Sequence, residues 1–204
     1  MTTRADRVVF GVLGVLTLLA VWQLQAGLGS SADGGRAGSN PGAAATRVIT
    51  GDRAAAQNTA ELQPKRLRIP SLDIDAPVLP IAADGSQLAP PSDPQTVGWW
   101  SDGARPGAER GTAILTGHTV STGGGVFDDL DQMLPGQRVQ ILSSGPRLRL
   151  QVTSVTVYHK ATLAEHAAEI FNQSSAGRVA LVTCEDWDGA EYLSNVVVIA
   201  APTG

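Results

Sequence analysis

Residues 148–157 read Leu-Arg-Leu-Gln-Val-Thr-Ser-Val-Thr-Val, and this stretch decides the fold class. Leu148, Leu150 and Val152 alternate with polar residues, which predicts a strand that buries one face. The apolar positions then continue at Val155 with the face shifted by one residue, so we expect a β-bulge near Ser154.

Short apolar runs bounded by turn residues lie on both sides of this strand and predict further strands: Arg66–Ile69, Ile74–Ile81, Thr112–Thr116, Arg138–Leu142, Val179–Cys184 and Asn195–Ala200. Prolines bound or interrupt the first two, which predicts edge strands or bulges. Only Leu163–Phe171 has helical spacing of its apolar residues. Many short strands without strand–helix alternation predict an all-β barrel or sandwich.

The composition narrows the possible functions. The chain has 204 residues, 43% hydrophobic and 17% charged, which suits one domain with extensions. A net charge of −4 argues against nucleic-acid binding. One cysteine rules out an internal disulfide, and with three histidines it makes a zinc site improbable, so we expect neither metal nor cofactor. The acidic residues that could suggest calcium are better explained as a solvated surface: Asp84, Asp128, Asp129 and Asp131.

The N-terminal part predicts a membrane anchor. Residues 8–28 carry no charge, and about 21 helical residues span about 30 Å, enough to cross a bilayer. Arginines precede this segment, so residues 1–7 are expected in the cytoplasm, although a cleaved signal peptide is the alternative. Residues 29–61 are small and polar and predict a flexible linker. Residues 62–204 are then an extracytoplasmic domain on the cell membrane.

The candidate chemistry depends on the single cysteine. Cys184 ends one predicted strand, and His118 directly follows another. If these strands are neighbours, the thiol and the imidazole form the nucleophile–base pair of cysteine acyl transfer. The alternative is a structural cysteine that packs as a small hydrophobe.

Four motifs occur in a characteristic order: Thr116-Gly-His118, Val126-Phe-Asp-Asp-Leu130, Leu134-Pro-Gly-Gln-Arg-Val139 and Leu181-Val-Thr-Cys184. Together they resemble the sortase family, and most of all the class F sortases of actinobacteria. The resemblance covers residues 62–200. It implies an eight-stranded sortase-type β-barrel with one or two short helices, preceded here by the N-terminal transmembrane helix.

The resemblance also implies an activity. Sortases are membrane-anchored cysteine transpeptidases that cleave an LPXTG-like sorting signal of surface proteins and form a thioacyl enzyme. An amine of a peptidoglycan precursor or a pilin lysine, or water, then takes the acyl group. By position, Cys184 is the nucleophile and His118 the general acid that protonates the leaving amine. His159 and His166 match no motif and are expected on the surface.

The third catalytic residue of the family is missing. A YRDN-like segment should supply an arginine, but this chain reads Tyr192-Leu-Ser-Asn195, with Leu193 at the arginine position. Arg178 lies six strand residues from Cys184, about 20 Å, and cannot replace it. Arg147 or Arg149 from another strand remains an alternative. Acidic residues after Cys184 further disfavour a thiolate, so weakened activity is expected.

Two other functions stay open. The missing arginine and the acidic loop are compatible with a catalytically silent sortase-fold module that binds peptides or cell-wall fragments. A lone exported thiol at Cys184 is also compatible with a redox sensor that does not need His118.

Overall fold

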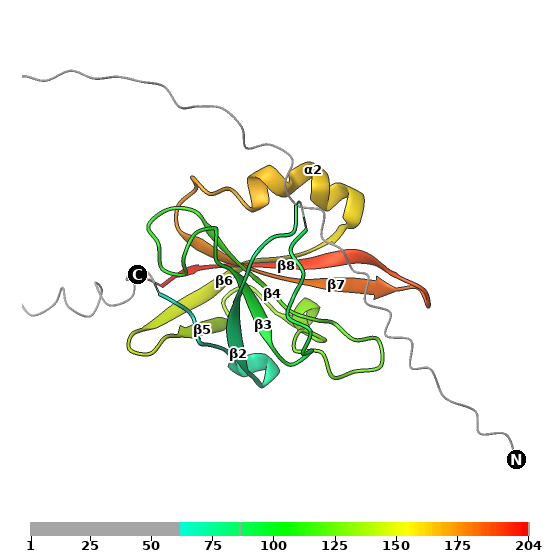
Figure 1. Ribbon diagram of the computed structural model, residues 1–204, viewed down its shortest axis with the longest axis horizontal. Coiled ribbons are helices and arrows are strands. Elements are labelled where there is room, and N and C mark those ends of the chain that lie inside the picture. The colour runs from blue at the N-terminus through cyan, green and yellow to red at the C-terminus, as the bar shows by residue number, and fades with distance from the viewer. Residues whose placement is uncertain (1–61, 86, 204) are drawn as a thin grey trace, which may run out of the picture.

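The computed structural model describes residues 62–85 and 87–203, which form a β-barrel with a helix against its outer surface (Figure 1). The strands are β1 (Arg66–Ile69), β2 (Ile74–Ile81), β3 (Val97–Trp100), β4 (Thr112–Thr116), β5 (Arg138–Leu142), β6 (Arg147–His159), β7 (Arg178–Trp187) and β8 (Tyr192–Pro202). The helices are α2 (Lys160–Ile170) and the 3-10 turns η1 (Pro70–Leu72) and η2 (Leu130–Gln132). The expected cytoplasmic segment 1–7, anchor 8–28 and linker 29–61 lie outside the described residues. Within the described part, no helix is long and apolar enough to span a membrane.

The strands close in the order β1-β2-β3-β4-β7-β8-β6-β5. The β2–β3 and β4–β7 pairs are parallel, and the other pairs are antiparallel. The predicted all-β class and eight-stranded barrel are therefore confirmed, and the sandwich alternative is wrong. The parallel β4–β7 pair matters most for the site, because it brings the carboxyl ends of these two strands together.

The barrel interior is filled by alternating apolar side chains. Leu115 on β4, Leu181 on β7 and Val198 on β8 are fully buried there, as is Phe127 of the segment after His118. Because successive side chains of a strand point to opposite faces, the residues between these point to the outer face of the sheet.

A second apolar cluster covers part of that outer face. Leu163 and Ile170 of α2 pack with Ala180, Val182 and Val197 of β7 and β8. Figure 1 shows α2 lying alongside β7 and β8, outside the barrel. Cys184 is the next outward position on β7 after Val182, so it lies beyond one end of this apolar cover.

The structure corrects several sequence expectations. The proline-containing strands are not edge strands, because the barrel is closed. Pro77 belongs to the final pair between β1 and β2, and Pro80 lies beyond the part of β2 that pairs with β1. The bulge is confirmed by a register shift between Val152 and Ser154. Strands β7 and β8 are longer than predicted, since their polar ends pair with each other as a hairpin without an apolar face. β3 lacked a recognised alternation and was not among the predicted strands.

Candidate active site

Cys184 and His118 lie at the same end of neighbouring parallel strands. The last β4–β7 pair is Thr116 with Val182, and Gly117 continues it by donating its N–H to the Val182 carbonyl over 3.2 Å. One residue further, His118 stands at the level of Cys184. Adjacent strands are about 4.8 Å apart, so the structure brings the predicted thiol and imidazole to one small region.

Cys184 is half-buried and faces the outer surface of the sheet. It pairs with Asn195 of β8, whose side-chain amide donates to the Thr183 carbonyl over 3.2 Å and lies 3.9 Å from Cys184 Sγ. Asn195 is itself buried, so its amide is fixed. The thiol is thus held at a defined place but remains partly accessible.

Hydroxyl groups on the inner side fix the backbone around His118. Thr183 Oγ1 donates to the Gly117 carbonyl over 3.0 Å and exchanges a hydrogen bond with Thr119 Oγ1 over 2.7 Å. The Tyr192 hydroxyl donates to the Thr119 carbonyl over 2.9 Å. Both chain neighbours of His118 are therefore tied to β7 or β8, the strands that carry the rest of the site.

The imidazole of His118 is oriented by the segment between β2 and β3. Its Nε2 lies 2.7 Å from the Pro91 carbonyl oxygen. Because a carbonyl oxygen only accepts, Nε2 must carry the hydrogen, and the neutral ring then has its lone pair on Nδ1. Nearby, hydrogen bonds from the Thr96 hydroxyl and the Gln95 N–H lower the pKa of Asp93, and His118 lowers it further when its ring is protonated. The structure thus assigns Nδ1 as the nitrogen available for proton transfer.

The environment of the thiol favours its neutral form. Burial raises the pKa of the Cys184 thiol, and the neighbouring Glu185 carboxylate raises it further, while the Lys160 ammonium lowers it. Burial also raises the pKa of Glu185 itself. An adjacent base or cation is therefore needed to populate the thiolate, which is the nucleophilic form.

The position expected to hold arginine is occupied by an exposed leucine. Leu193 precedes Asn195 by two residues on β8, so it shares the outer face with Cys184, and it is 36% exposed. Arg147 and Arg149 lie in the part of β6 that pairs with β5. The β6 residue beside Asn195 is Tyr158, which is nine residues, or about 30 Å of strand, from Arg149. The alternative that one of them fills the gap is wrong.

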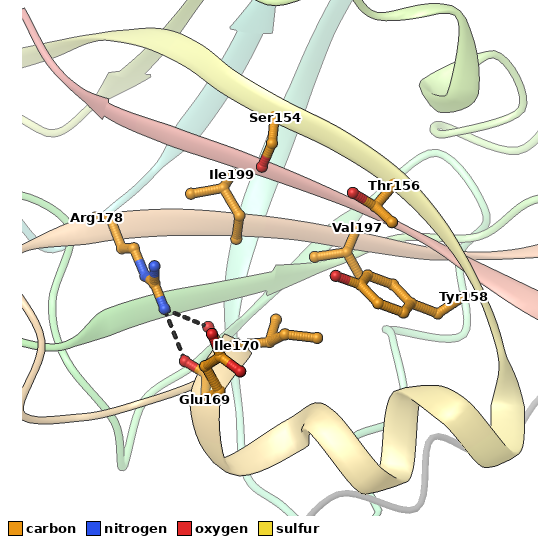
Figure 2. A pocket seen from close by; sticks show the side chains of 8 residues that line it. All are labelled: Ser154, Thr156, Tyr158, Glu169, Ile170, Arg178, Val197 and Ile199. Carbon is orange, nitrogen blue, oxygen red and sulfur yellow. Dashed lines mark hydrogen bonds between the residues drawn. The ribbon is translucent and has the colours of Figure 1, made fainter.

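Arg178 is bound at the end of α2, away from Cys184, as its distance along the strand predicted. Its guanidinium donates to the carbonyls of Glu169 and Ile170 at the end of α2, over 2.8 and 3.0 Å, and to Thr112 Oγ1 over 3.0 Å. Figure 2 shows these carbonyl contacts at the rim of a pocket of about 200 Å³ between α2 and strands β6 and β8. Arg178 therefore fastens α2 to the barrel.

Other candidate residues have structural explanations or stand apart. His159 and His166 are exposed, as expected. Asp128 accepts the N–H groups of Val120, Gly124 and Gly125 and so shapes the glycine-rich loop after His118. Within residues 62–85 and 87–203, the structure contains no cluster of ligands suited to a metal ion. The roles of Pro91, Tyr192 and Lys160 could not be predicted from local patterns, because they depend on contacts across the sequence: Pro91 with His118, Tyr192 with Thr119, and Lys160, at the start of α2, with the charge state of Cys184.

A closed eight-stranded barrel with a thiol and an imidazole at the ends of parallel strands defines a specific class of cysteine protein. The family described as Sortase domain matches residues 67–203. The chain belongs to the sortase family. A comparison with curated proteins gives no match.

Solved sortase structures share the fold. Sortase C-1 from Actinomyces oris is 21% identical, with a TM-score of 0.53 over 76% of this chain and 82% of that chain. Sortase C of Streptococcus pneumoniae is 15% identical, with a TM-score of 0.54 over 69% of this chain and 68% of its own. Sortase C from Clostridium perfringens SM101 is 19% identical, with a TM-score of 0.52 over 72% and 73%. These likenesses support the barrel and its topology, and they do not support the narrower assignment to class F.

Proposed function

We propose that this protein is a membrane-anchored, extracytoplasmic cysteine transpeptidase. Cys184 attacks the scissile carbonyl of a peptide to form a thioacyl enzyme, and His118 protonates the amine that leaves. An amine then takes the acyl group, or water takes it more slowly. The proposal makes Cys184 and His118 the catalytic residues.

One observation carries this proposal: the parallel register of β4 with β7, which, continued by two residues beyond Thr116 and Val182, puts His118 level with Cys184. The register of Thr116 with Val182, continued by the hydrogen bond of Gly117, supports their proximity. The clamp formed by Thr183, Thr119 and Tyr192 supports a site whose two halves are held in a constant geometry, which acyl transfer requires.

The finer features of the proposal rest on the sequence. An LPXTG-like sorting signal is the proposed donor, and a peptidoglycan precursor or a pilin lysine is the proposed acceptor. Residues 8–28 are the proposed single-pass anchor in the cell membrane, and the order of motifs favours class F among the sortases.

The test is direct detection of the thioacyl enzyme. The purified chain is incubated with a panel of sorting-signal peptides, and the intact mass and the Cys184 peptide are measured. We expect a mass increase on Cys184 equal to the N-terminal part of a peptide, absent in Cys184→Ala and strongly reduced in His118→Ala. An adduct that forms equally well in His118→Ala would contradict the proposed role of His118.

A second function is favoured by Leu193, which removes the cation that the family uses at this position. The domain would then bind peptides or cell-wall fragments without cleaving them. Absence of an adduct with every peptide, together with unchanged peptide affinity in Cys184→Ala, would support this binding module. Loss of cell-wall attachment of a surface protein in a Cys184→Ala strain would exclude it.

A further inference from the structure

Lys160 occupies the place beside the missing arginine. The last pairs between β6 and β8 are Tyr158 with Asn195 and His159 with Ser194. One more step of this antiparallel register brings Lys160, the first residue of α2, to the level of Leu193. The expected cation is therefore absent from β8, but the Lys160 ammonium is present at the adjoining end of β6.

The strand faces put Lys160 on the side of the thiol. Tyr158 packs into the outer cluster together with Leu163, and α2, which Lys160 begins, lies against this same outer side. Leu193, Asn195 and Cys184 also face outward. Two strand spacings and two residues separate the backbones of Lys160 and Cys184, about 12 Å, and the long flexible lysine stem shortens this gap.

The observed side-chain contact gives the direction in which Lys160 points. Its Nζ lies 3.8 Å from Glu191 Oε2, and Glu191 directly precedes Tyr192 at the start of β8. The ammonium thus lies toward the tip of the β7–β8 hairpin, two residues beyond Leu193 on the side away from Asn195, the partner of Cys184, and it must leave Glu191 to reach the level of the thiol. In agreement, Lys160 is the cation that lowers the pKa of the Cys184 thiol.

The arginines considered above and the second lysine of the chain are unsuited to this task. No lysine or arginine follows Arg178 in the chain, and Arg178 is bound to the end of α2. Arg147 and Arg149 lie along the β5 side of the barrel. The only other lysine, Lys65, precedes β1, where its N–H donates to the Leu142 carbonyl of β5.

We propose that Lys160 is a further catalytic residue that takes over the function of the absent arginine. The proposal rests on the proposed function. The Cys184 thiol passes its proton to Nδ1 of His118, the resulting thiolate adds to the carbonyl carbon, and the C–O π electron pair moves to oxygen. The Lys160 ammonium stabilises that negative charge by a hydrogen bond and keeps its proton. When the intermediate collapses, the C–N bond breaks, the amine takes the proton of the His118 imidazolium, and a thioester remains on Cys184.

Glu191 holds the ammonium in the unliganded protein. This ion pair is long and partly solvated, with 28% of the Lys160 side chain and 63% of the Glu191 side chain exposed, and is therefore weak. A carbonyl oxygen that becomes negative next to Cys184 can compete for the ammonium at little cost. Lys160 is thus prepositioned rather than locked.

The first test measures local charge at the thiol without any peptide substrate. Cys184 is alkylated by iodoacetate, an anion, and by neutral iodoacetamide, and the ratio of the two rate constants is compared between variants. Removing a positive charge at this range should lower the ratio about threefold or more in Lys160→Met. Lys160→Arg should keep the ratio, and Lys65→Met is the matched control that should leave it unchanged. An unchanged ratio in Lys160→Met would overturn the proposal.

The second test measures stabilisation of the developing oxyanion. With p-nitrophenyl acetate, Cys184 Sγ takes the acetyl group and p-nitrophenolate leaves without needing a proton, so His118 is not required as the acid. Loss of an oxyanion donor costs about 10²–10³ in rate in buried sites, and we expect at least about tenfold in Lys160→Met, because the Lys160 side chain is only partly buried, with 28% exposed. Leu193→Arg in the Lys160→Met background should restore the rate, because it returns a cation to the expected position.

The outcomes separate this inference from the proposed function. Acetylation that stays within twofold of wild type in Lys160→Met, or that Leu193→Arg fails to restore, would overturn the role of Lys160 even if sorting peptides acylate Cys184. If no peptide acylates Cys184 while both Lys160 effects are observed, the charge assignment stands and the transpeptidase proposal fails. Equal thermal unfolding midpoints of the variants exclude misfolding as the cause.

Discussion

Replacing Thr183 by valine tests the clamp that joins the two halves of the site. Thr183 is 1% exposed, and valine has nearly the same shape but no hydroxyl. Thr183→Val therefore removes the hydrogen bond to the Gly117 carbonyl and the one shared with Thr119, while apolar packing is retained. Any effect comes from the lost polar contacts.

The size of the effect follows from these contacts. Each lost hydrogen bond contributes about 0.5–1.5 kcal/mol, and a buried carbonyl left without a partner costs about 1–3 kcal/mol. Counting the Gly117 contact once, as the unpaired carbonyl at about 1.5–2 kcal/mol, and the Thr119 contact as one hydrogen bond at about 0.5–1 kcal/mol predicts a loss of about 2–3 kcal/mol in the free energy of unfolding. At about 3 °C per kcal/mol for a domain of this size, the unfolding midpoint should fall by about 6–9 °C.

The assay is thermal unfolding followed by circular dichroism, with Thr153→Val as the control. Thr153 is exposed and donates a single hydrogen bond to the Ile199 carbonyl, so its replacement should change the midpoint by less than about 2 °C. If Thr183→Val unfolds within about 2 °C of wild type, the hydroxyl network does not hold β4 against β7, and the reasoning about the fixed geometry is refuted.

Three other outcomes follow from the structure. Tyr192→Phe removes the hydroxyl that holds the Thr119 carbonyl, so it should slow Cys184 acylation about threefold or more. The control, Tyr158→Phe, changes the other tyrosine of the chain and should leave the acylation rate unchanged. Equal acylation rates in the two variants would contradict the clamp. Burial raises the folded-state pKa of Cys184, so the stability that the neutral thiol contributes is complete below about pH 8.5 and is lost as the pH rises through the folded pKa. In denaturant unfolding, the free energy of unfolding of Cys184→Ala should therefore fall less steeply above about pH 8.5 than that of wild type. Identical pH curves would argue against the raised pKa. Gly177→Ala would place a Cβ 1.8 Å from the Ala108 carbonyl oxygen and should lower the free energy of unfolding by more than about 3 kcal/mol in denaturant unfolding. In the control Gly145→Ala, the added Cβ meets nothing within 4 Å, so this variant should unfold almost like wild type.

Much of the barrel could be predicted because its strands bury one face. Arg66–Ile69, Ile74–Ile81, Thr112–Thr116 and Arg138–Leu142 begin and end as the apolar runs predicted. The hairpin ends of β7 and β8 could not, since Glu185 is only partly buried, Asp186 and Trp187 are exposed, and the three residues show no apolar alternation. Helix α2 begins at Lys160 rather than Leu163, because its first turn is polar and carries no apolar signal.

The site was only partly predictable for a related reason. Cys184 and His118 were identified from their positions at strand ends, and their proximity depended on an assumed β4–β7 pairing that the structure contains. Lys160 reaches the same region through the lateral pairing of β6 with β8, which no local pattern in the sequence encodes. Pro91 contacts His118 through a backbone carbonyl, and a sequence carries no signal for such a contact.

The parallel pairing of β4 with β7 also has a consequence for folding kinetics. Thr183 and Gly117, which join the two halves, are 66 positions apart, and β5, β6 and α2 are formed by the chain between them. Closing so long a loop is entropically costly, so this contact should form late, after the local β5–β6 hairpin. During refolding, the characteristic reactivity of the thiol should therefore return with the last phase, which makes Cys184 a built-in reporter of complete folding.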